Sequence, residues 1–215
     1  MQDLFQSGGV AAPIALAGRD AVVLRGFALA VAPQVVSDMH AVAARAPFRN
    51  MVTPGGRAMS VAMTNCGSAG WVTDRSGYRY TSHDPESGQP WPALPATFRD
   101  LAVRAAAAAG FDGFVPDACL VNRYAPGTRL SLHQDRNEAD LTAPIVSVSL
   151  GLPAKFLFGG PGRGDPVTRV VLAHGDVVVW GRAARLAHHG VDTLRDGDHP
   201  LTGRFRFNLT FRKAR

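Results

Sequence analysis

The sequence predicts a single α+β domain that is mainly β, with helices in its N-terminal half and a sandwich or barrel of strands in its C-terminal half. The chain has 215 residues, enough for one substantial core, and 46% of them are apolar. Helical periodicity is confined to the part before residue 111, whereas short strand-like segments follow from residue 119 onward. This composition excludes a disordered, collagen-like or coiled-coil protein.

The N-terminal quarter predicts an arm, a strand and a helix. Residues 1–20 are rich in Gly, Ala and Pro, which is typical of a flexible arm. Residues 21–24 predict a short strand. Pro33 suits the first turn of a helix, and apolar residues then recur at helical spacing until Pro47 ends it.

An irregular segment separates this helix from a second one. The second helix is expected from Thr97, as N-cap, to Gly110, as C-terminal stop. Between the helices, residues 48–96 are dense in Gly, Pro, Ser and Thr and also carry Trp, Tyr and Arg. So irregular a stretch is either a set of short hairpins or a functional lid. We refer to residues 48–96 as the lid segment.

Residues 119–215 predict the β core. The Gly-rich run 159–164 is expected to be a hairpin loop, because it lacks the Gly-Lys-Ser/Thr ending of a phosphate loop and follows a strand. Strands are expected at residues 119–125, 130–133, 145–150, 155–158, 169–173, 176–180, 186–191 and 204–212.

The charge is positive and is carried by arginine. Lys and Arg number 23 and Asp and Glu 17, a formal charge of +6, and only two of the basic residues are lysines. A basic surface favours polyanions, and arginine binds phosphate or carboxylate through two parallel hydrogen bonds. Codon composition produces the same bias, so the charge is compatible with nucleic acid without establishing it.

Cysteine usage and the N-terminus indicate the compartment. Cys66 and Cys119 are too few for a disulfide framework, which favours a reducing environment. No signal peptide begins at Met1, and no apolar stretch is long enough to cross a bilayer. We expect a monomeric cytoplasmic protein without a membrane partner.

Two His-x-Asp pairs indicate where a metal would bind. On an extended chain such a pair places an imidazole and a carboxylate on the same side, and a distant histidine completes a triad that leaves positions open on iron. His174 and Asp176 flank a glycine directly before a strand, so a turn is the better interpretation there. His133 and Asp135 end a strand and have histidines far downstream. Those downstream histidines include the adjacent residues His188 and His189. Because neighbours on a strand face opposite sides, only one of the two can point at the metal, and alternation does not decide which.

The last predicted strand carries polar side chains on one face. Arg206, Asn208, Thr210 and Arg212 alternate with apolar residues. By itself this pattern is typical of an edge strand with one face in water. An inward row of two arginines and an asparagine, however, would hold a dicarboxylate by bidentate pairing. A 2-oxoacid that chelates iron beside such a row is coherent chemistry.

Taken in order, these motifs resemble the AlkB family of iron(II)- and 2-oxoglutarate-dependent dioxygenases. The resemblance implies one dioxygenase domain over residues 1–215, with a double-stranded β-helix (jelly-roll) core at residues 119–215 and a nucleotide-recognition role for the lid segment. It rests on residues 47–67, 122–127, 130–135, 145–151, 174–181, 189–190 and 206–212.

The same resemblance implies the cofactors and their ligands. Iron(II) is expected on His133, Asp135 and His189, with O2 as second cosubstrate, and Asp135 and Arg212 are expected to be catalytic. The residues expected to hold 2-oxoglutarate are Asn122, Tyr124, Arg206, Asn208 and Arg212.

The implied reaction is oxidative demethylation of N-alkylated bases, which repairs single-stranded or flipped-base DNA, with RNA as a second substrate. It releases formaldehyde, succinate and CO2, and the base must leave the duplex stack first. In the family the base stacks between an aromatic residue and the distal ligand histidine, and the matching positions here are Trp71, Tyr78 and His189. The residues expected at the base site are Thr53, Met63, Trp71, Tyr78, Asn137, Arg163 and Trp180.

Asn137 departs from the family pattern, which usually has an acid at this position to read the exocyclic amine of the base. A carboxylate only accepts hydrogen bonds, whereas an amide also donates. We therefore expect a weaker preference for cationic 1-methyladenine and 3-methylcytosine and better acceptance of 1-methylguanine and 3-methylthymine. The neighbouring Glu138 is an alternative source of the missing charge.

Two other functions are compatible with parts of the pattern. A dioxygenase acting on a protein or small molecule would keep the iron and 2-oxoglutarate residues but would not need an aromatic lid. A non-catalytic nucleic-acid-binding barrel would have lost at least one metal ligand, and none is missing here.

Overall fold

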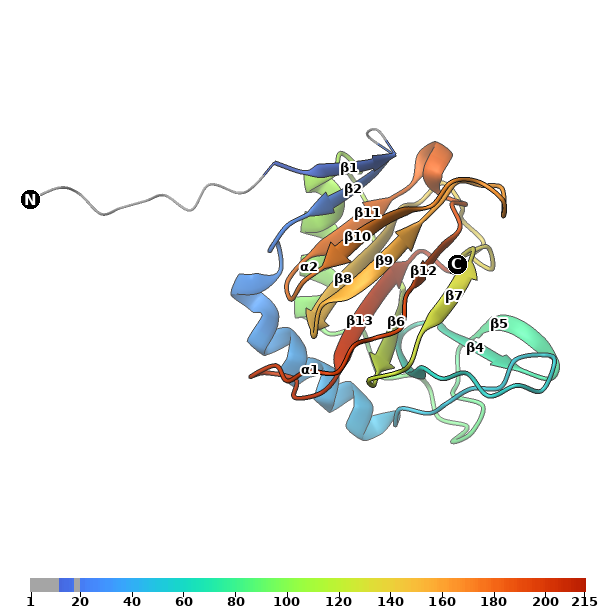
Figure 1. The fold of residues 1–215 in the computed structure, drawn as a ribbon. Helices are drawn as coiled ribbons and strands as arrows, with labels where there is room; N and C mark the ends of the chain where they lie inside the picture. The colour runs from blue at the N-terminus through green and yellow to red at the C-terminus, as the bar shows by residue number, and fades with distance from the viewer. Residues whose placement is uncertain (1–11, 18–19) are drawn as a thin grey trace, which may run out of the picture.

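A computed structural model describes residues 12–17 and 20–215, and its two β-sheets face each other with two helices outside the larger sheet (Figure 1). The helices are α1 (Ala32–Arg45) and α2 (Ala96–Ala108), with 3-10 turns η1 (Leu29–Val31) and η2 (Arg182–Ala184). The strands are β1 (Ile14–Ala17), β2 (Ala21–Leu24), β3 (Ala62–Gly67), β4 (Gly70–Asp74), β5 (Gly77–Thr81), β6 (Ala118–Tyr124), β7 (Leu130–His133), β8 (Ile145–Gly151), β9 (Ala154–Phe158), β10 (Thr168–Leu172), β11 (Val177–Trp180), β12 (His189–Val191) and β13 (Arg206–Arg212).

The two facing sheets are antiparallel throughout. The larger sheet has the order β1-β2-β11-β8-β13-β6-β3, and the smaller has the order β10-β9-β12-β7. Apart from the consecutive pairs β1–β2 and β9–β10, neighbours in each sheet come from distant parts of the chain, as in a jelly roll, in which strands alternate between the two sheets. The predicted mainly β fold with a double-stranded β-helix core is confirmed.

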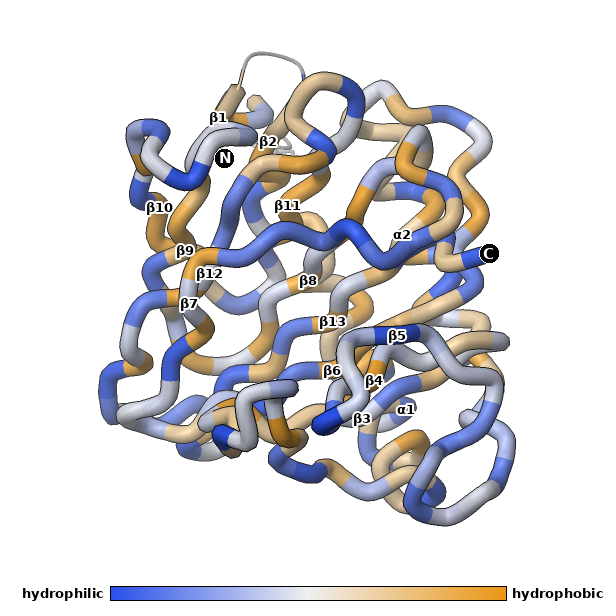
Figure 2. Tube along the Cα trace, turned by 90° about the vertical axis from the view of Figure 1, so that its right-hand side faces the viewer, coloured by the Kyte–Doolittle hydropathy of each residue, from blue (hydrophilic) through white to orange (hydrophobic). Residues whose placement is uncertain are grey.

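The helices cover the outer face of the larger sheet because their apolar residues lie on one side. Val35 and Met39 of α1 and Phe98 and Leu101 of α2 are fully buried in a cluster with outward-facing residues of the larger sheet, such as Phe211. A second cluster lies between the sheets. In Figure 2 the interior strands are mostly hydrophobic in colour and the peripheral loops mostly hydrophilic.

The lid segment is partly core and partly hairpin. Its strand β3 pairs with β6 in the larger sheet, with Met63 opposite Asn122. Strands β4 and β5 form a separate two-stranded hairpin at the edge of the molecule, next to β6 and β7 in Figure 1. Hairpins were one of the two expectations for this segment, but a core strand inside it was not expected.

Several boundaries differ from the sequence-based expectations for identifiable reasons. The helix α2 begins at Ala96 after Pro95, and the Thr97 hydroxyl donates to Asp38 of α1 rather than capping its own helix. The strand expected at residues 186–191 shortens to β12, because η2 and a turn precede it. The last strand is not an edge strand, since β13 pairs with both β6 and β8 and both its faces are buried.

The predicted arm is only partly visible. Residues 14–17, which lie within it, form β1 at the edge of the larger sheet, whereas residues 1–11 and 18–19 are outside the described part of the chain. Among the described residues, no helix is long and apolar enough to cross a membrane.

The segment containing His174 and Asp176 forms a turn, as expected. The intervening glycine has a φ of +84°, a conformation that side-chain-bearing residues rarely adopt. The Asp176 carboxylate accepts hydrogen bonds from the backbone N–H groups of Gly26 and Ala173 and from Arg25. This acid is therefore engaged in closing a loop.

Candidate active site

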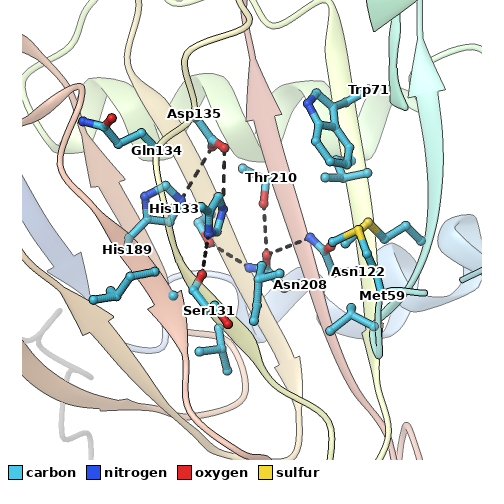
Figure 3. A pocket seen from close by; sticks show the side chains of 18 of the residues that line it. Met59, Trp71, Asn122, Ser131, His133, Gln134, Asp135, His189, Asn208 and Thr210 are labelled. Atoms are coloured by element: carbon cyan, nitrogen blue, oxygen red, sulfur yellow. Dashed lines mark hydrogen bonds and ion pairs between the residues drawn. The ribbon is translucent and has the colours of Figure 1, made fainter. Parts of the chain in front are cut away.

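A cavity of about 640 Å³ lies between the two sheets and opens beside the hairpin β4–β5 (Figure 3). It receives side chains from both sheets, from the hairpin and from the loop after β7. All of the site residues expected from the sequence line it: Thr53, Met63, Trp71, Tyr78, Asn122, Tyr124, His133, Asp135, Asn137, Arg163, Trp180, His189, Arg206, Asn208 and Arg212.

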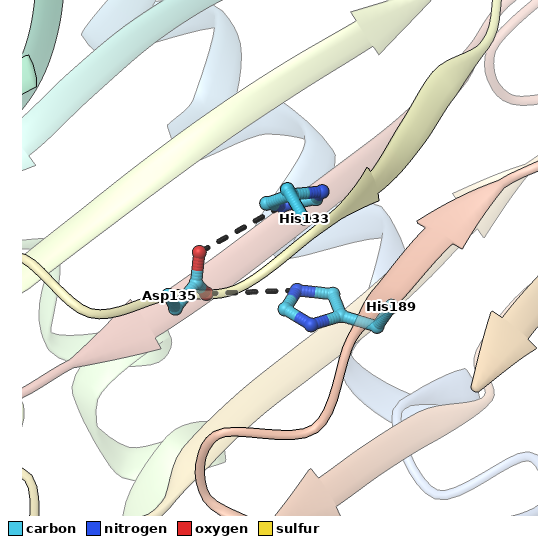
Figure 4. Close-up of side chains that lie close together, drawn as sticks. All are labelled: His133, Asp135 and His189. Atoms are coloured by element: carbon cyan, nitrogen blue, oxygen red, sulfur yellow. Dashed lines mark ion pairs between the residues drawn. The ribbon is translucent and has the colours of Figure 1, made fainter. Parts of the chain in front are cut away.

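Three of these side chains converge as metal ligands would (Figure 4). One ligand atom each of His133, Asp135 and His189 lies within 4.8 Å of the others. Antiparallel pairing of β7 with β12 places His133 directly opposite His189. Gly190 permits this, because a Cβ at that position would lie 2.6 Å from the carbonyl oxygen of Leu130. Among the described residues this is the one such cluster.

Hydrogen bonds orient both imidazoles. The Nδ1 atom of His133 is 2.9 Å from the carbonyl oxygen of Ser131, and that of His189 is 3.1 Å from the carbonyl oxygen of Ala187. Since a carbonyl only accepts, each Nδ1 carries the proton and each Nε2 is left with its lone pair. Both Nε2 atoms lie 3.7 Å from Asp135. Burial, with His133 beside it, lowers the pKa of His189 to about 3, so its imidazole is neutral and able to bind a metal.

Asp135 is held by an arginine of β13. The Nε and Nη2 atoms of Arg212 donate to Asp135 Oδ2 at 2.8 and 2.6 Å. Burial by itself would raise the pKa of Asp135, but Arg212 and the two histidines outweigh it and hold that pKa well below its usual range. The carboxylate is therefore ionised, as a metal ligand must be.

The second arginine of β13 has unused donors. Arg206 is 1% exposed, and its Nη2 donates to Ser149 Oγ at 3.0 Å. Its Nε and Nη1 atoms are buried and have no partner, and its guanidinium lies over the ring of Tyr124. A buried, unpaired guanidinium is costly unless an anion meets it. Such a group at the base of a cavity fits one carboxylate of a dicarboxylate such as 2-oxoglutarate.

Asparagines line the path between this arginine and the histidines. Asn208 is held by Ser147, by the carbonyl of Val148 and by Thr210. Asn122 donates weakly to Asn208, at 3.4 Å, and its own carbonyl oxygen is buried without a partner. The donor set of two imidazoles and a carboxylate beside this polar wall fits iron(II) with a chelating 2-oxoacid.

Two aromatic rings stand at the mouth of the cavity. Trp71 of β4 and Tyr78 of β5 are stacked, with centroids 5.7 Å apart and planes 21° from parallel. The indole Nε1 of Trp71 donates to Asn137 Oδ1 at 3.3 Å. Tyr78 is 49% exposed, which is unusual for plain packing under a loop. The pair presents apolar surface beside the triad.

The two histidines of the triad differ in exposure. His189 was expected to be the stacking partner, but its side chain is only 7% exposed and packs against Trp180 at 4.8 Å between centroids. The side chain of His133 is 36% exposed. The open imidazole face therefore belongs to His133, and Trp180 lies behind the triad, 1% exposed, rather than at the mouth.

The buried contact of Glu138 with Tyr80 and Arg185 was not predicted. Glu138, considered above as a reader of the base, is 7% exposed and is bound to Tyr80 and Arg185 inside the protein. No local pattern reveals this, since the three residues come from β5, the loop after β7 and the loop before β12. Glu138 therefore does not read the base, because its buried carboxylate is already bound to two donors in the interior.

Comparisons with known proteins agree with this geometry. The family model described as "2OG-Fe(II) oxygenase superfamily" matches residues 20–212. The chain is 61% identical over 194 residues to the alpha-ketoglutarate-dependent dioxygenase AlkB of Escherichia coli (strain K12), covering 90% of both chains. It is 39% identical over 110 residues to the DNA N(6)-methyladenine demethylase ALKBH1D of Arabidopsis thaliana, covering 45% of this chain and 24% of that one.

A solved structure has the same fold. The structure of OsALKBH1 superposes with a TM-score of 0.82 at 27% identity, covering 94% of this chain and all of that one. The order of motifs, the His-Asp-His cluster and these matches agree, and the chain belongs to the AlkB family within the 2OG-Fe(II) oxygenase superfamily, as an iron(II)- and 2-oxoglutarate-dependent dioxygenase.

Proposed function

We propose that this dioxygenase demethylates N-alkylated bases in single-stranded or flipped-base DNA, with RNA as a second substrate. The observation that carries the proposal is the stacked pair Trp71 and Tyr78, which lines the same cavity as the partly exposed ring of His133. A planar slot between an aromatic pair and an imidazole fits a flat base. The ALKBH1D relative is named for the same kind of reaction.

Bound iron(II), 2-oxoglutarate and dioxygen would supply the oxidation that converts the N-methyl group to hydroxymethyl, which leaves as formaldehyde, with succinate and CO2 as co-products. His133, Asp135 and His189 would hold the metal, and Arg206 would bind the carboxylate far from it. The remaining cosubstrate contacts are proposed for Asn122, Tyr124, Asn208 and Arg212.

The contact between Trp71 and Asn137 supports a preference among bases. An indole N–H only donates, so the Asn137 carbonyl oxygen must face Trp71, and the amide NH2 is left as a donor toward the cavity. A donor there favours a base with a carbonyl oxygen, such as 1-methylguanine or 3-methylthymine. Glu138 cannot restore a negative charge to the mouth, because its carboxylate is bound in the interior.

The base preference has a direct test. Asn137→Asp should shift the ratio of kcat/KM values toward 1-methyladenine and 3-methylcytosine by roughly tenfold, the effect of one hydrogen bond to a charged group. The measurement is kcat/KM on oligonucleotides carrying each of the four lesions. An unchanged ranking would exclude Asn137 as a reader of the base without touching the proposed reaction.

The main experiment follows the reaction itself. Methylated single-stranded DNA and RNA oligonucleotides are incubated with the protein, iron(II), 2-oxoglutarate and ascorbate, and formaldehyde and methyl loss are measured. We expect methyl loss and formaldehyde in equal amounts on at least one lesion. Succinate formation without methyl loss on any oligonucleotide would instead favour a protein or small-molecule substrate.

The setting of the enzyme is part of the proposal. A nucleic-acid substrate and two free buried cysteines, Cys66 and Cys119, are compatible with a cytoplasmic enzyme. We propose that it acts as a monomer, with one complete cavity per chain. Cell fractionation tests the location. Light scattering of the purified protein measures its molar mass and so tests the monomeric state.

A further inference from the structure

We propose that Glu138 is a positioning residue that sets the placement of the metal ligand Asp135 through two arginines, and that Tyr80 of the hairpin holds Glu138 in place. This inference rests on the proposed metal site. It concerns side chains that lie outside the triad and that the reaction itself does not use.

Glu138 lies at the centre of a buried network. Its side chain is 1% exposed. Oε1 accepts the hydroxyl of Tyr80 at 2.6 Å and lies 3.4 Å from Nε of Arg212, and Oε2 is 3.1 Å from Nη2 of Arg185. Three elements distant in sequence therefore meet on one carboxylate.

Both arginines of the network also hold Asp135. Arg212 donates twice to the Asp135 carboxylate, and Nη1 of Arg185 donates to the Asp135 backbone carbonyl at 2.8 Å. The Nε atom of Arg185 is in turn fixed on the carbonyl of Ala143 at 2.9 Å. The side chain and the backbone of the ligand are thus clamped separately, each by an arginine that Glu138 contacts.

The charges of this network cancel. Two guanidinium groups and the two carboxylates of Glu138 and Asp135 sum to zero beside the triad. Without the negative charge of Glu138, one positive charge would remain uncompensated in a buried site. That charge repels a divalent cation at short range and competes with it for the Asp135 oxygens.

Tyr80 connects the network to the hairpin that carries Trp71 and Tyr78. Its hydroxyl is the one neutral donor on Glu138, and in β5 it lies opposite Trp71 of β4. The hairpin that carries the aromatic pair and the two arginines that hold the metal ligand therefore share one carboxylate. The hairpin is placed relative to the metal through this contact.

The test measures binding of Mn(II), a redox-stable substitute for iron(II), to the metal-free full-length protein by electron paramagnetic resonance of free Mn(II). Glu138→Gln keeps the volume and removes the charge, and it should weaken Mn(II) binding by roughly 10- to 100-fold, as loss of a partner of a metal ligand does. Tyr80→Phe should weaken it about two- to tenfold, the effect of one neutral hydrogen bond. Glu138→Asp, which retains the charge, should bind more tightly than Glu138→Gln.

A matched control separates positioning from general damage. Asp84 is also a buried acid, 2.6 Å from Arg49, and it does not line the cavity. Asp84→Asn should bind Mn(II) as the wild type does. Circular dichroism confirms that each variant is folded before titration.

The outcomes are distinguishable. Wild-type affinity in Glu138→Gln, or an equal loss in Asp84→Asn, overturns the inference. If Glu138→Gln does not fold, Tyr80→Phe decides, and unchanged affinity in that variant overturns it. If the wild-type protein bound no Mn(II), this result would contradict the proposed metal site itself.

Discussion

Two arginine–aspartate pairs in this protein have the same geometry and different surroundings. At the base of the cavity, Nη2 of Arg212 is 2.6 Å from Oδ2 of Asp135, and the two side chains are 5% and 9% exposed. At the tip of the hairpin β4–β5, Nη2 of Arg79 is also 2.6 Å from Oδ2 of Asp74, but these side chains are 38% and 44% exposed.

The comparison teaches that burial, not distance, decides what an ion pair does. Water and salt screen the hairpin pair, so it contributes little to the free energy of unfolding and its loss should destabilise the protein only slightly. The buried pair is poorly screened by solvent, so each of its charges depends on its partner. Under the proposed function, we therefore expect the buried pair to hold the metal and cosubstrate residues in place, and the hairpin to tolerate changes of its exposed charges.

The largest expected effect comes from breaking the buried pair. Asp135→Ala removes a proposed ligand and leaves the buried Arg212 with only the more distant Glu138, 3.4 Å away, as an acidic partner. We expect turnover to fall more than about 100-fold and the free energy of unfolding to fall by about 3–5 kcal/mol. Formaldehyde release and urea unfolding measure the two effects. An equal loss of turnover and of unfolding free energy in Asp74→Ala, at the hairpin, would contradict the comparison.

The next effect concerns the unpaired guanidinium of the cavity base. Arg206→Lys keeps the positive charge but cannot donate two parallel hydrogen bonds. The KM for 2-oxoglutarate should rise roughly 30- to 150-fold, corresponding to about 2–3 kcal/mol. Steady-state kinetics with varied 2-oxoglutarate measure this. Arg204→Lys serves as control, since Arg204 is an exposed residue paired with Asp196, and an equal rise there would refute the assignment.

A smaller and more selective effect is expected at the hairpin. Trp71→Ala removes one side of the proposed base slot, which corresponds to about 1–3 kcal/mol of stacking. The KM for a methylated oligonucleotide should rise by roughly 5- to 150-fold, while succinate formation without oligonucleotide stays unchanged. Phe205→Ala, at an exposed aromatic outside the cavity, is the control. Equal losses of both activities in Trp71→Ala would show that the hairpin is not separable from the cavity base.

The smallest effect belongs to the exposed pair. Hydrogen bonds from Arg79 and then Ser76 hold the pKa of Asp74 below its ordinary value of 3.8. The folded state thus binds fewer protons, so the stability this pair adds is present above that value and is lost as pH falls below it. At every pH between 5 and 8, the Tm of Asp74→Asn should lie within about 1 °C of the wild-type Tm. Scanning calorimetry at pH 5 and 8 checks this, and a larger shift at either pH would contradict the screened character of the pair.

Much of the fold followed from periodicity and turn residues. Seven of the eight strands expected after residue 118 lie within two residues of their positions in the structure, because alternation and glycine or proline turns are local properties. Strand β12 is the exception, since residues 186–188 belong to the turn and loop that follow η2 and the strand begins only at His189. The core role of β3 was hidden for a related reason: its surroundings are irregular, and only pairing with β6 makes it a core strand.

What the sequence determined by itself is the chemistry of the site: two imidazoles, a carboxylate and a row of arginine and asparagine, in the order typical of the family. Only the tertiary structure decided which of these groups are exposed, which are buried and which have partners. It turned His133 rather than His189 toward the mouth, and it buried Glu138. It also left Arg206 unpaired while engaging Arg212, although both lie on the same face of β13. The reason is that burial and ion pairing depend on residues distant in the sequence, such as Asp135 and Arg212, which are 77 positions apart, and no local pattern contains them.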